Sequence, residues 1–228
     1  DSAPAEGAPR VSAHLDRGGK RRADPDRVLA LSDGVFAIVL TILVLEIAVP
    51  EGLSHGSLRP FLEELRPTLV AWVISFLITG MYWTAHRDIF SQVQKVNRDL
   101  VWLNLLYLLP VSLIPFAASV LGEYPHEPIA LQFYGVVMIL ATVMRLSLFW
   151  YVSHRPALLW ADKVSERSRV GLAISASPIV IYALAMAVAP FASIASIILS
   201  FSVPIFYFLL ITLLRDRADT QAEADEFT

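Results

Sequence analysis

The chain has 228 residues, of which 56% are hydrophobic and 17% are charged, and its formal net charge is −3. Such an apolar composition is typical of a polytopic membrane protein and unusual for a soluble domain of this length. The nearly balanced charge gives no indication of a nucleic-acid partner. The absence of cysteine excludes disulfides, thiolate metal sites and cysteine nucleophiles.

The two ends of the chain differ from its centre in composition. Residues 1–26 are polar, charged and rich in Ala, Pro and Gly, and they lack the apolar core of a secretory signal peptide. This composition predicts a disordered tail over 1–26. Residues 215–228 are predicted to be a second, acidic tail, which leaves 27–214 as the membrane domain.

Six apolar segments are long enough to cross a bilayer, which requires about 20 mostly apolar residues. They lie at about 28–49, 67–86, 100–121, 129–151, 170–189 and 191–213. The predicted fold class is therefore all-α, a multi-pass protein with six transmembrane helices. Residues 51–66 predict a short amphipathic helix outside the membrane. Prolines 110, 115, 178 and 204 predict kinks inside the spans.

The distribution of basic residues predicts the orientation of the spans. Fifteen of the 18 lysines and arginines fall in the N-terminal segment through Arg27, in the C-terminal tail and in the second and fourth connections, which share one side of a six-span topology. The positive-inside rule places that side in the cytoplasm. Both termini are then cytoplasmic.

The first span, RVLALSDGVFAIVLTILVLE, carries a Ser-Asp pair in its first turns. An ionisable side chain inside a bilayer is costly, so Asp33 is a candidate functional residue. Polar residues of four spans are predicted to lie at one depth near the cytoplasm, with Trp83 one turn deeper: Arg27, Ser32, Asp33, His86, Asn104 and Arg145.

This polar layer has two interpretations. An Asp–Arg or Asp–His pair would lock the helices together, whereas a relay would use Asp33 or His86 to move protons or bind an ion. Arg145 could instead extend to the interface without a partner.

Three motifs resemble one known family, the unconventional endolysosomal transmembrane potassium channels and their bacterial homologues. The family's first helix carries an arginine, three further residues and then Phe-Ser-Asp. Here Arg27 precedes Leu31-Ser32-Asp33, so that Leu31 replaces the phenylalanine. MYWTAHRDIF resembles the end of the family's second helix, and NLLYLLPVSLIPFAAS resembles its third. The resemblance extends over roughly residues 27–214.

The resemblance implies a potassium-permeable cation channel in the bacterial plasma membrane. It implies a homotetramer in the lipid bilayer with a central pore lined by the first helix, with K⁺ as the permeant ion and with no cofactor, metal or small-molecule substrate. The implied constriction is formed by Ile38, Ile42 and Leu45, which share one helical face. The Thr41 hydroxyl lies beside that face, and Glu46 lies near the outer mouth.

Four copies of Ile38 would form an apolar ring that gates by dewetting and width. The sequence contains no Thr-Val-Gly-Tyr-Gly filter, so we expect only a modest preference for potassium. The same aliphatic spacing is also typical of helix packing or lipid contact. No span carries the regular arginine series of a voltage sensor.

Other classes of function remain as alternatives. A proton-coupled secondary transporter would use the intramembrane Asp, His and Arg at helices broken by proline. An enzyme is disfavoured, because His86 and His154 lack metal-ligand spacing and no serine nucleophile motif is present. A scaffold without transport activity fits the first-helix signature poorly.

Overall fold

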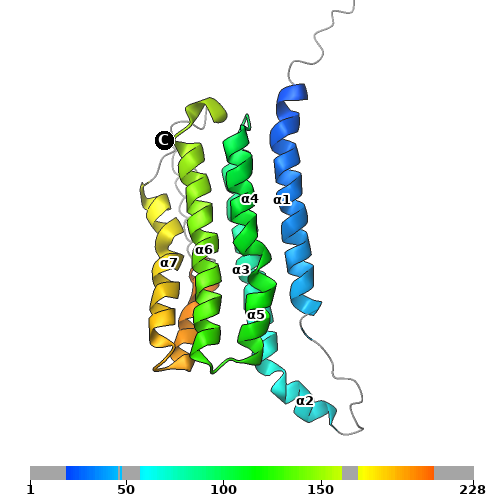
Figure 1. Ribbon diagram of the computed structural model, residues 1–228, viewed down its shortest axis with the longest axis vertical. Coiled ribbons are helices and arrows are strands. Elements are labelled where there is room, and N and C mark those ends of the chain that lie inside the picture. The colour runs from blue at the N-terminus through cyan, green and yellow to red at the C-terminus, as the bar shows by residue number, and fades with distance from the viewer. Residues whose placement is uncertain (1–18, 46, 48–56, 161–168, 208–228) are drawn as a thin grey trace, which may run out of the picture.

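The computed structural model describes residues 19–45, 47, 57–160 and 169–207 of the chain. Its long helices run side by side in alternating directions, so that α1, α4 and α7 begin at the end where α3 and α6 finish (Figure 1). The helices are α1 Gly19–Leu45, α2 Leu58–Glu64, α3 Arg66–Ser91, α4 Arg98–Ser112, α5 Ile114–Glu123, α6 Pro128–Ser153, the 3-10 turn η1 Pro156–Leu158, α7 Arg169–Val188 and an unlabelled helix over Ser193–Tyr207.

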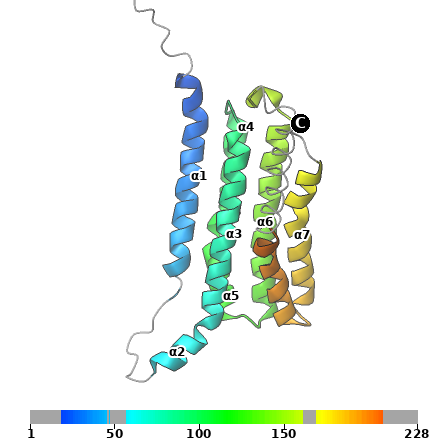
Figure 2. The ribbon, with the colours of Figure 1, turned by 180° about the vertical axis from the view of Figure 1, so that it is seen from behind.

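These helices confirm the predicted all-α, multi-pass fold class. Four described segments are long and apolar enough to cross a membrane: Pro25–Leu45, Arg66–Ser91, Arg98–Glu123 and Pro128–Ser153. Two shorter apolar helices, Ser175–Val188 and Ser193–Tyr207, lie where the fifth and sixth spans were predicted. The short helix α2 lies within the predicted segment 51–66, at the end opposite the start of α1 (Figures 1 and 2).

The first boundary differs from the prediction. Helix α1 begins at Gly19, so residues 19–26 are helical rather than part of a disordered tail. Lysine, arginine and alanine, which fill 20–23, have high helix propensity and extend the membrane helix beyond the apolar segment. The remainder of the predicted tail, and the predicted tail over 215–228, lie outside the described residues.

The third predicted span is broken into α4 and α5 at Leu113, between Pro110 and Pro115. Proline lacks the N–H that would bond four residues back, and its ring collides with that carbonyl. The chain tightens at the break, where the Leu113 amide donates to the Pro110 carbonyl at 3.2 Å. The other two prolines leave their helices unbroken, since α7 continues through Pro178 and the last helix through Pro204.

Helix α6 holds the centre of the bundle, where it packs against α4, α5 and α7, while α1 lies at the edge against α3, α4 and α5. Figure 2 shows the Ser193–Tyr207 helix beside α6 and α7. Hydrogen bonds of buried tyrosine hydroxyls join α3 to α6. Inside a membrane no water is present to satisfy these hydroxyls, so they must find partners within the protein. The Tyr82 hydroxyl lies 2.7 Å from Thr142 Oγ1, and the Tyr134 hydroxyl lies 3.2 Å from Ser75 Oγ.

Helices α3 and α5 are in close contact at Gly122. A Cβ atom at this position would lie 2.9 Å from the Thr68 Cα, which is a backbone atom and cannot move aside alone. We therefore expect Gly122→Ala to destabilise the fold by about 1–3 kcal/mol, as overpacking commonly does. Gly80→Ala is the matched control, because nothing lies within 4 Å of a Cβ there.

Thermal unfolding of the detergent-solubilised protein measures both substitutions. A lowered midpoint for Gly122→Ala with an unchanged or raised midpoint for Gly80→Ala is the expected pair. Equal midpoints would show that α3 and α5 do not meet at this contact.

Candidate pore helix and its polar anchor

Helix α1 has two distinct faces. Its buried face carries Ser32, Phe36, Val39 and Leu43, which are spaced four, three and four residues apart and are at most 3% exposed. This spacing follows the helical repeat and turns one stripe of α1 toward α3, α4 and α5. The helix is therefore fixed in its rotation about its own axis.

The opposite face of α1 carries the residues that the resemblance implied for the constriction. Ile38, Ile42 and Leu45 are 58%, 37% and 74% exposed, and Thr41 is exposed beside them. The Thr41 hydroxyl donates to the Ile38 carbonyl of its own helix at 2.8 Å. A row of exposed aliphatic side chains on one helix marks contact with lipid or with another protein. Glu46 lies outside the described residues.

A shallow cavity of about 270 Å³ lies along this exposed side of α1. Ile38 and Ile42 line it from α1, and Pro115 and Phe116 line it from α5. These four side chains are apolar, the Ser112 hydroxyl is the polar group in the lining, and the Phe116 ring is 57% exposed. The cavity thus extends the apolar face of α1 onto the neighbouring helix.

A chain of hydrogen bonds on the buried side joins α1, α4 and α3. The Asn104 amide nitrogen donates to Ser32 Oγ at 2.9 Å, and Ser32 Oγ donates to the Val28 carbonyl at 3.0 Å. The Asn104 carbonyl oxygen lies 2.7 Å from His86 Nε2. Because that oxygen only accepts, His86 must carry its proton on Nε2. The network is buried, with none of the three side chains more than 1% exposed.

Aromatic rings enclose His86 on several sides. Its ring stacks on Tyr107 with a centroid separation of 5.4 Å and on Phe90 at 4.6 Å, and Phe36 lies 5.9 Å away. His86 Nδ1 is buried and has no hydrogen-bond partner among the described residues. In this arrangement the imidazole serves as a hydrogen-bond donor and as a packing surface.

Asp33 is held separately from this network. The Trp83 indole nitrogen donates to Asp33 Oδ1 at 2.8 Å, and the Arg87 guanidinium lies over the Trp83 ring at 5.8 Å from its centroid. The contact links α1 to α3 one residue beyond Ser32. Both side chains of the Ser-Asp pair therefore have partners: Ser32 bonds to α4 and Asp33 bonds to α3.

The structure brings Ser32, Asp33, Trp83, His86 and Asn104 together, but it separates Arg145 from them. The Arg145 guanidinium donates to the Ser175 carbonyl of α7 at 2.6 Å. Sequence depth alone placed Arg145 in the same layer, but depth does not determine which way a side chain points around its helix. The hypothesised Asp33–Arg145 pair is therefore not formed. Arg27 is exposed, five residues before Ser32.

Sequence reasoning missed the aromatic enclosure, although the sequence carries a signal for it. Each network residue is followed one helical turn later by an aromatic residue: Phe36 after Ser32, Phe90 after His86, and Tyr107 after Asn104. Side chains one turn apart share a face. Across the described ranges, no group of three His, Asp or Glu side chains is placed to hold a metal ion.

The hydrogen bond to Asp33 can be tested by Trp83→Phe, which removes the indole N–H and retains an aromatic ring. We expect a loss of about 0.5–1.5 kcal/mol in stability, the usual net worth of a hydrogen bond, because Asp33 is only half-buried. Trp72→Phe is the matched control, because the Trp72 indole nitrogen is buried on the same helix without a partner in the described part of the chain.

Thermal unfolding in detergent again measures the two variants side by side. The midpoint should fall for Trp83→Phe and stay level or rise for Trp72→Phe. A fall of similar size in both would mean that lost ring area, rather than the bond to Asp33, accounts for the change.

The chain is similar in sequence to known ion channels. Residues 27–115 match the family model of the endosomal/lysosomal potassium channel TMEM175. A protein of Streptomyces collinus named as a potassium channel is 39% identical over 131 residues, which span 56% of this chain and 64% of that relative. The human endosomal/lysosomal proton channel TMEM175 is 26% identical over 189 residues, 82% of this chain and 36% of that protein.

The fold has a relative of known structure. The crystal structure of a lysosomal potassium-selective channel TMEM175 homologue from Chamaesiphon minutus superposes with a TM-score of 0.67 at 27% identity, over 82% of this chain and 97% of that one. The chain spans less than two thirds of the length of the Streptomyces and human relatives. These matches confirm the resemblance to this channel family.

Proposed function

Because this chain is a homologue of the TMEM175 channels, we propose that it is a potassium-permeable cation channel with α1 as the pore-lining helix. The observation that carries the proposal is the division of α1 into two faces. A polar network and buried aromatic residues hold one face against the bundle, and the other face presents aliphatic side chains outward. Only the outward face is left to meet a pore or a neighbour.

The proposed assembly is a homotetramer in the plasma membrane of a bacterium. Each chain supplies one pore-lining helix. A ring of identical subunits with cyclic symmetry is therefore the simplest way to enclose a central pore. The apolar cavity between α1 and α5 supports this, because it gives a second copy of the chain an apolar surface to contact beside Ile38 and Ile42. The exposed edge position of α1 leaves that surface open (Figure 1).

The proposed constriction consists of rings of Ile38, Ile42 and Leu45 around K⁺. Backbone carbonyls inside an α-helix are bonded to the helix itself, so α1 has no carbonyl cage with which to replace an ion's water shell. Conduction would instead depend on whether the apolar rings are wide enough to stay wet. The Thr41 hydroxyl adds a polar atom beside the rings, and Glu46 at the outer mouth would attract cations.

The polar network gives the middle of α1, in the first half of its span Pro25–Leu45, a fixed position. Ser32 and Asp33 are bonded to α4 and α3, whereas Leu45, the last residue of the helix, is 74% exposed. Tilt or dilation of α1 would therefore move the rings while the helix stays in place at Ser32 and Asp33. In the proposed orientation both termini are cytoplasmic, and the anchor lies in the cytoplasmic half of the membrane.

Ion flux through the protein in liposomes tests the constriction. We expect K⁺ flux from the wild-type protein, and we expect Ile38→Asn to raise it about tenfold and to lower the preference for K⁺ over Na⁺. The asparagine amides would make the ring at position 38 easier to wet. A tenfold rise in flux corresponds to lowering the barrier to ion passage by about 1.4 kcal/mol. Ile198→Asn, at an exposed isoleucine on the last helix, should leave the flux unchanged.

The same assay separates the alternatives. A slow flux driven by a pH gradient would indicate the proton-coupled transporter instead, provided that the protein gives no unitary currents in a planar bilayer. Unitary currents carried by protons in place of K⁺ would retain the channel and overturn its proposed ion. No cation flux from an assembled protein would overturn both transport proposals.

Cross-linking tests the central position of α1, and the absence of native cysteine makes it direct. We expect Ile38→Cys to form disulfide-linked dimers of the chain under mild oxidation, because identical residues around a narrow axis come close together. Ile198→Cys should remain monomeric on a denaturing gel under the same conditions. Cross-linking of Ile198→Cys alone would place the last helix, rather than α1, at the axis.

A further inference from the structure

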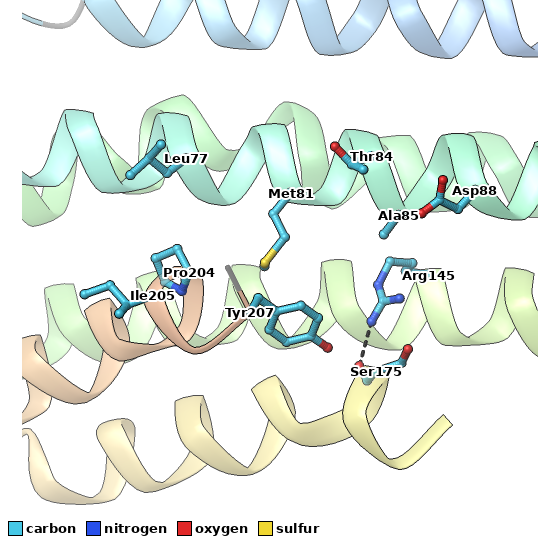
Figure 3. Close-up of a pocket in the computed structure, with 10 residues that line it drawn as sticks. All are labelled: Leu77, Met81, Thr84, Ala85, Asp88, Arg145, Ser175, Pro204, Ile205 and Tyr207. Atoms are coloured by element: carbon cyan, nitrogen blue, oxygen red, sulfur yellow. Dashed lines mark hydrogen bonds between the residues drawn. The ribbon is translucent and has the colours of Figure 1, made fainter. Parts of the chain in front are cut away.

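A cavity of about 630 Å³ lies on the side of α3 that faces away from α1, between α3, α6, α7 and the Ser193–Tyr207 helix (Figure 3). Cavities of about 300–1,000 Å³ that are mostly apolar with a few convergent polar groups are typical of small-molecule sites. None of the residues proposed for the pore lines it. The cavity therefore needs an explanation of its own.

Arg145 is the charged group at the wall of this cavity that is almost fully buried, with 6% of its surface exposed. Its guanidinium donates to the Ser175 carbonyl at 2.6 Å, and the Tyr207 hydroxyl points toward it (Figure 3). Both partners are uncharged. Within the described ranges no carboxylate forms a salt bridge with Arg145. A buried guanidinium is strongly stabilised by an anion, and these neutral partners do not supply one.

The lining of the cavity changes from polar to apolar along its length. Figure 3 places Arg145, Thr84 and Asp88 toward one end and Leu77 with Ile205 toward the other. The polar end is the end at which α3 finishes and α1 begins. Arg145 lies eight residues before the end of α6, about 12 Å along the helix at 1.5 Å per residue. A helix of 26 residues is about 39 Å long, so one centred in a hydrocarbon core about 30 Å thick places the Arg145 backbone roughly 7–8 Å below the head-group boundary. A phosphate on Arg145 would therefore lie below the surrounding head groups, inside the cavity.

We propose that this cavity binds an anionic phospholipid of the surrounding membrane, with its phosphate on the Arg145 guanidinium and an acyl chain along Leu77, Met81 and Ile205. The guanidinium fork matches two phosphate oxygens, and a charge-assisted pair of this kind is strong in a site with little water. The apolar half of the cavity has room for an acyl chain. A phospholipid carries such a chain and a free phosphate ion does not, so the phospholipid fits the whole cavity better. The proposal is independent of ion conduction, because its site shares no residue with α1.

Asp88 gives the proposal a further internal check. Its carboxylate lines the polar end of the same cavity and would repel a phosphate bound to Arg145. Removing the charge by Asp88→Asn should therefore tighten the binding of an anionic lipid. Were Asp88 instead the counter-ion of Arg145, the same substitution would lower stability and leave the lipid affinity unchanged.

The experiment titrates phosphatidylglycerol into the 228-residue chain in a neutral detergent. It follows the thermal midpoint and, by native mass spectrometry, the bound lipid. We expect the lipid to raise the midpoint of the wild type. Arg145→Gln should weaken the apparent affinity by about 10-fold to 100-fold, which is the range for losing a hydrogen bond to a charged group. Arg59→Gln, at an exposed arginine of α2, is the control and should keep the wild-type response.

A second variant protects the test if Arg145→Gln fails to fold. Ala85→Phe places a ring in the cavity and leaves Arg145 in position, and it should also remove the response to the lipid. Ala183→Phe, on the exposed side of α7, is its matched control and should retain the response.

Three control titrations have outcomes that would overturn the proposal. Phosphatidylcholine at the same concentrations should give a much smaller shift, and an equal shift would show that the cavity takes acyl chains without reading charge. Protection by free fatty acid and not by phosphatidylglycerol would replace the proposed ligand. A full phosphatidylglycerol response in folded Arg145→Gln or Ala85→Phe would show that lipid binds elsewhere and that the cavity is filled by water or by the chain itself.

Discussion

The side-chain amide of Asn104 is the constraint on which the rest of the structure depends. It donates to Ser32 of α1 and accepts from His86 of α3, so one residue of α4 joins three helices. No water competes for these groups inside a membrane, and each buried group left unpaired costs about 1–3 kcal/mol. The three helices therefore have one favourable register and one favourable rotation.

The rotation of α1 decides which of its residues are available for function. With Ser32 turned inward, Phe36, Val39 and Leu43 follow it into the core, and Ile38, Thr41 and Ile42 are turned outward. An α1 rotated by half a turn would bury Ile38 and expose Ser32. The apolar outward face is thus a consequence of a polar contact several residues away.

The membrane helices keep their two most deeply placed charges apart. Asp33 meets the indole of Trp83 at the edge of the bundle, and Arg145 meets a backbone carbonyl on the far side of α3. Each charge is therefore solvated by neutral dipoles, which cost less to assemble than a buried ion pair but leave the charge itself uncompensated. One polar group serves the anchoring of α1, and the other lines a cavity that α1 does not reach.

The sequence by itself determined the all-α class, four segments long and apolar enough to span a membrane, the interruption between Pro110 and Pro115, and the placing of Ser32, Asp33, His86 and Asn104 at a similar depth. Apolar length, proline chemistry and the cost of polar groups in lipid are properties that a linear chain already carries. Only the tertiary structure decided that Arg145 turns toward α7 rather than Asp33, that aromatic rings enclose His86, and that a cavity lies beyond α3. Depth along a span can be counted from the sequence, but the direction of a side chain around its helix is fixed only when the neighbouring helices pack.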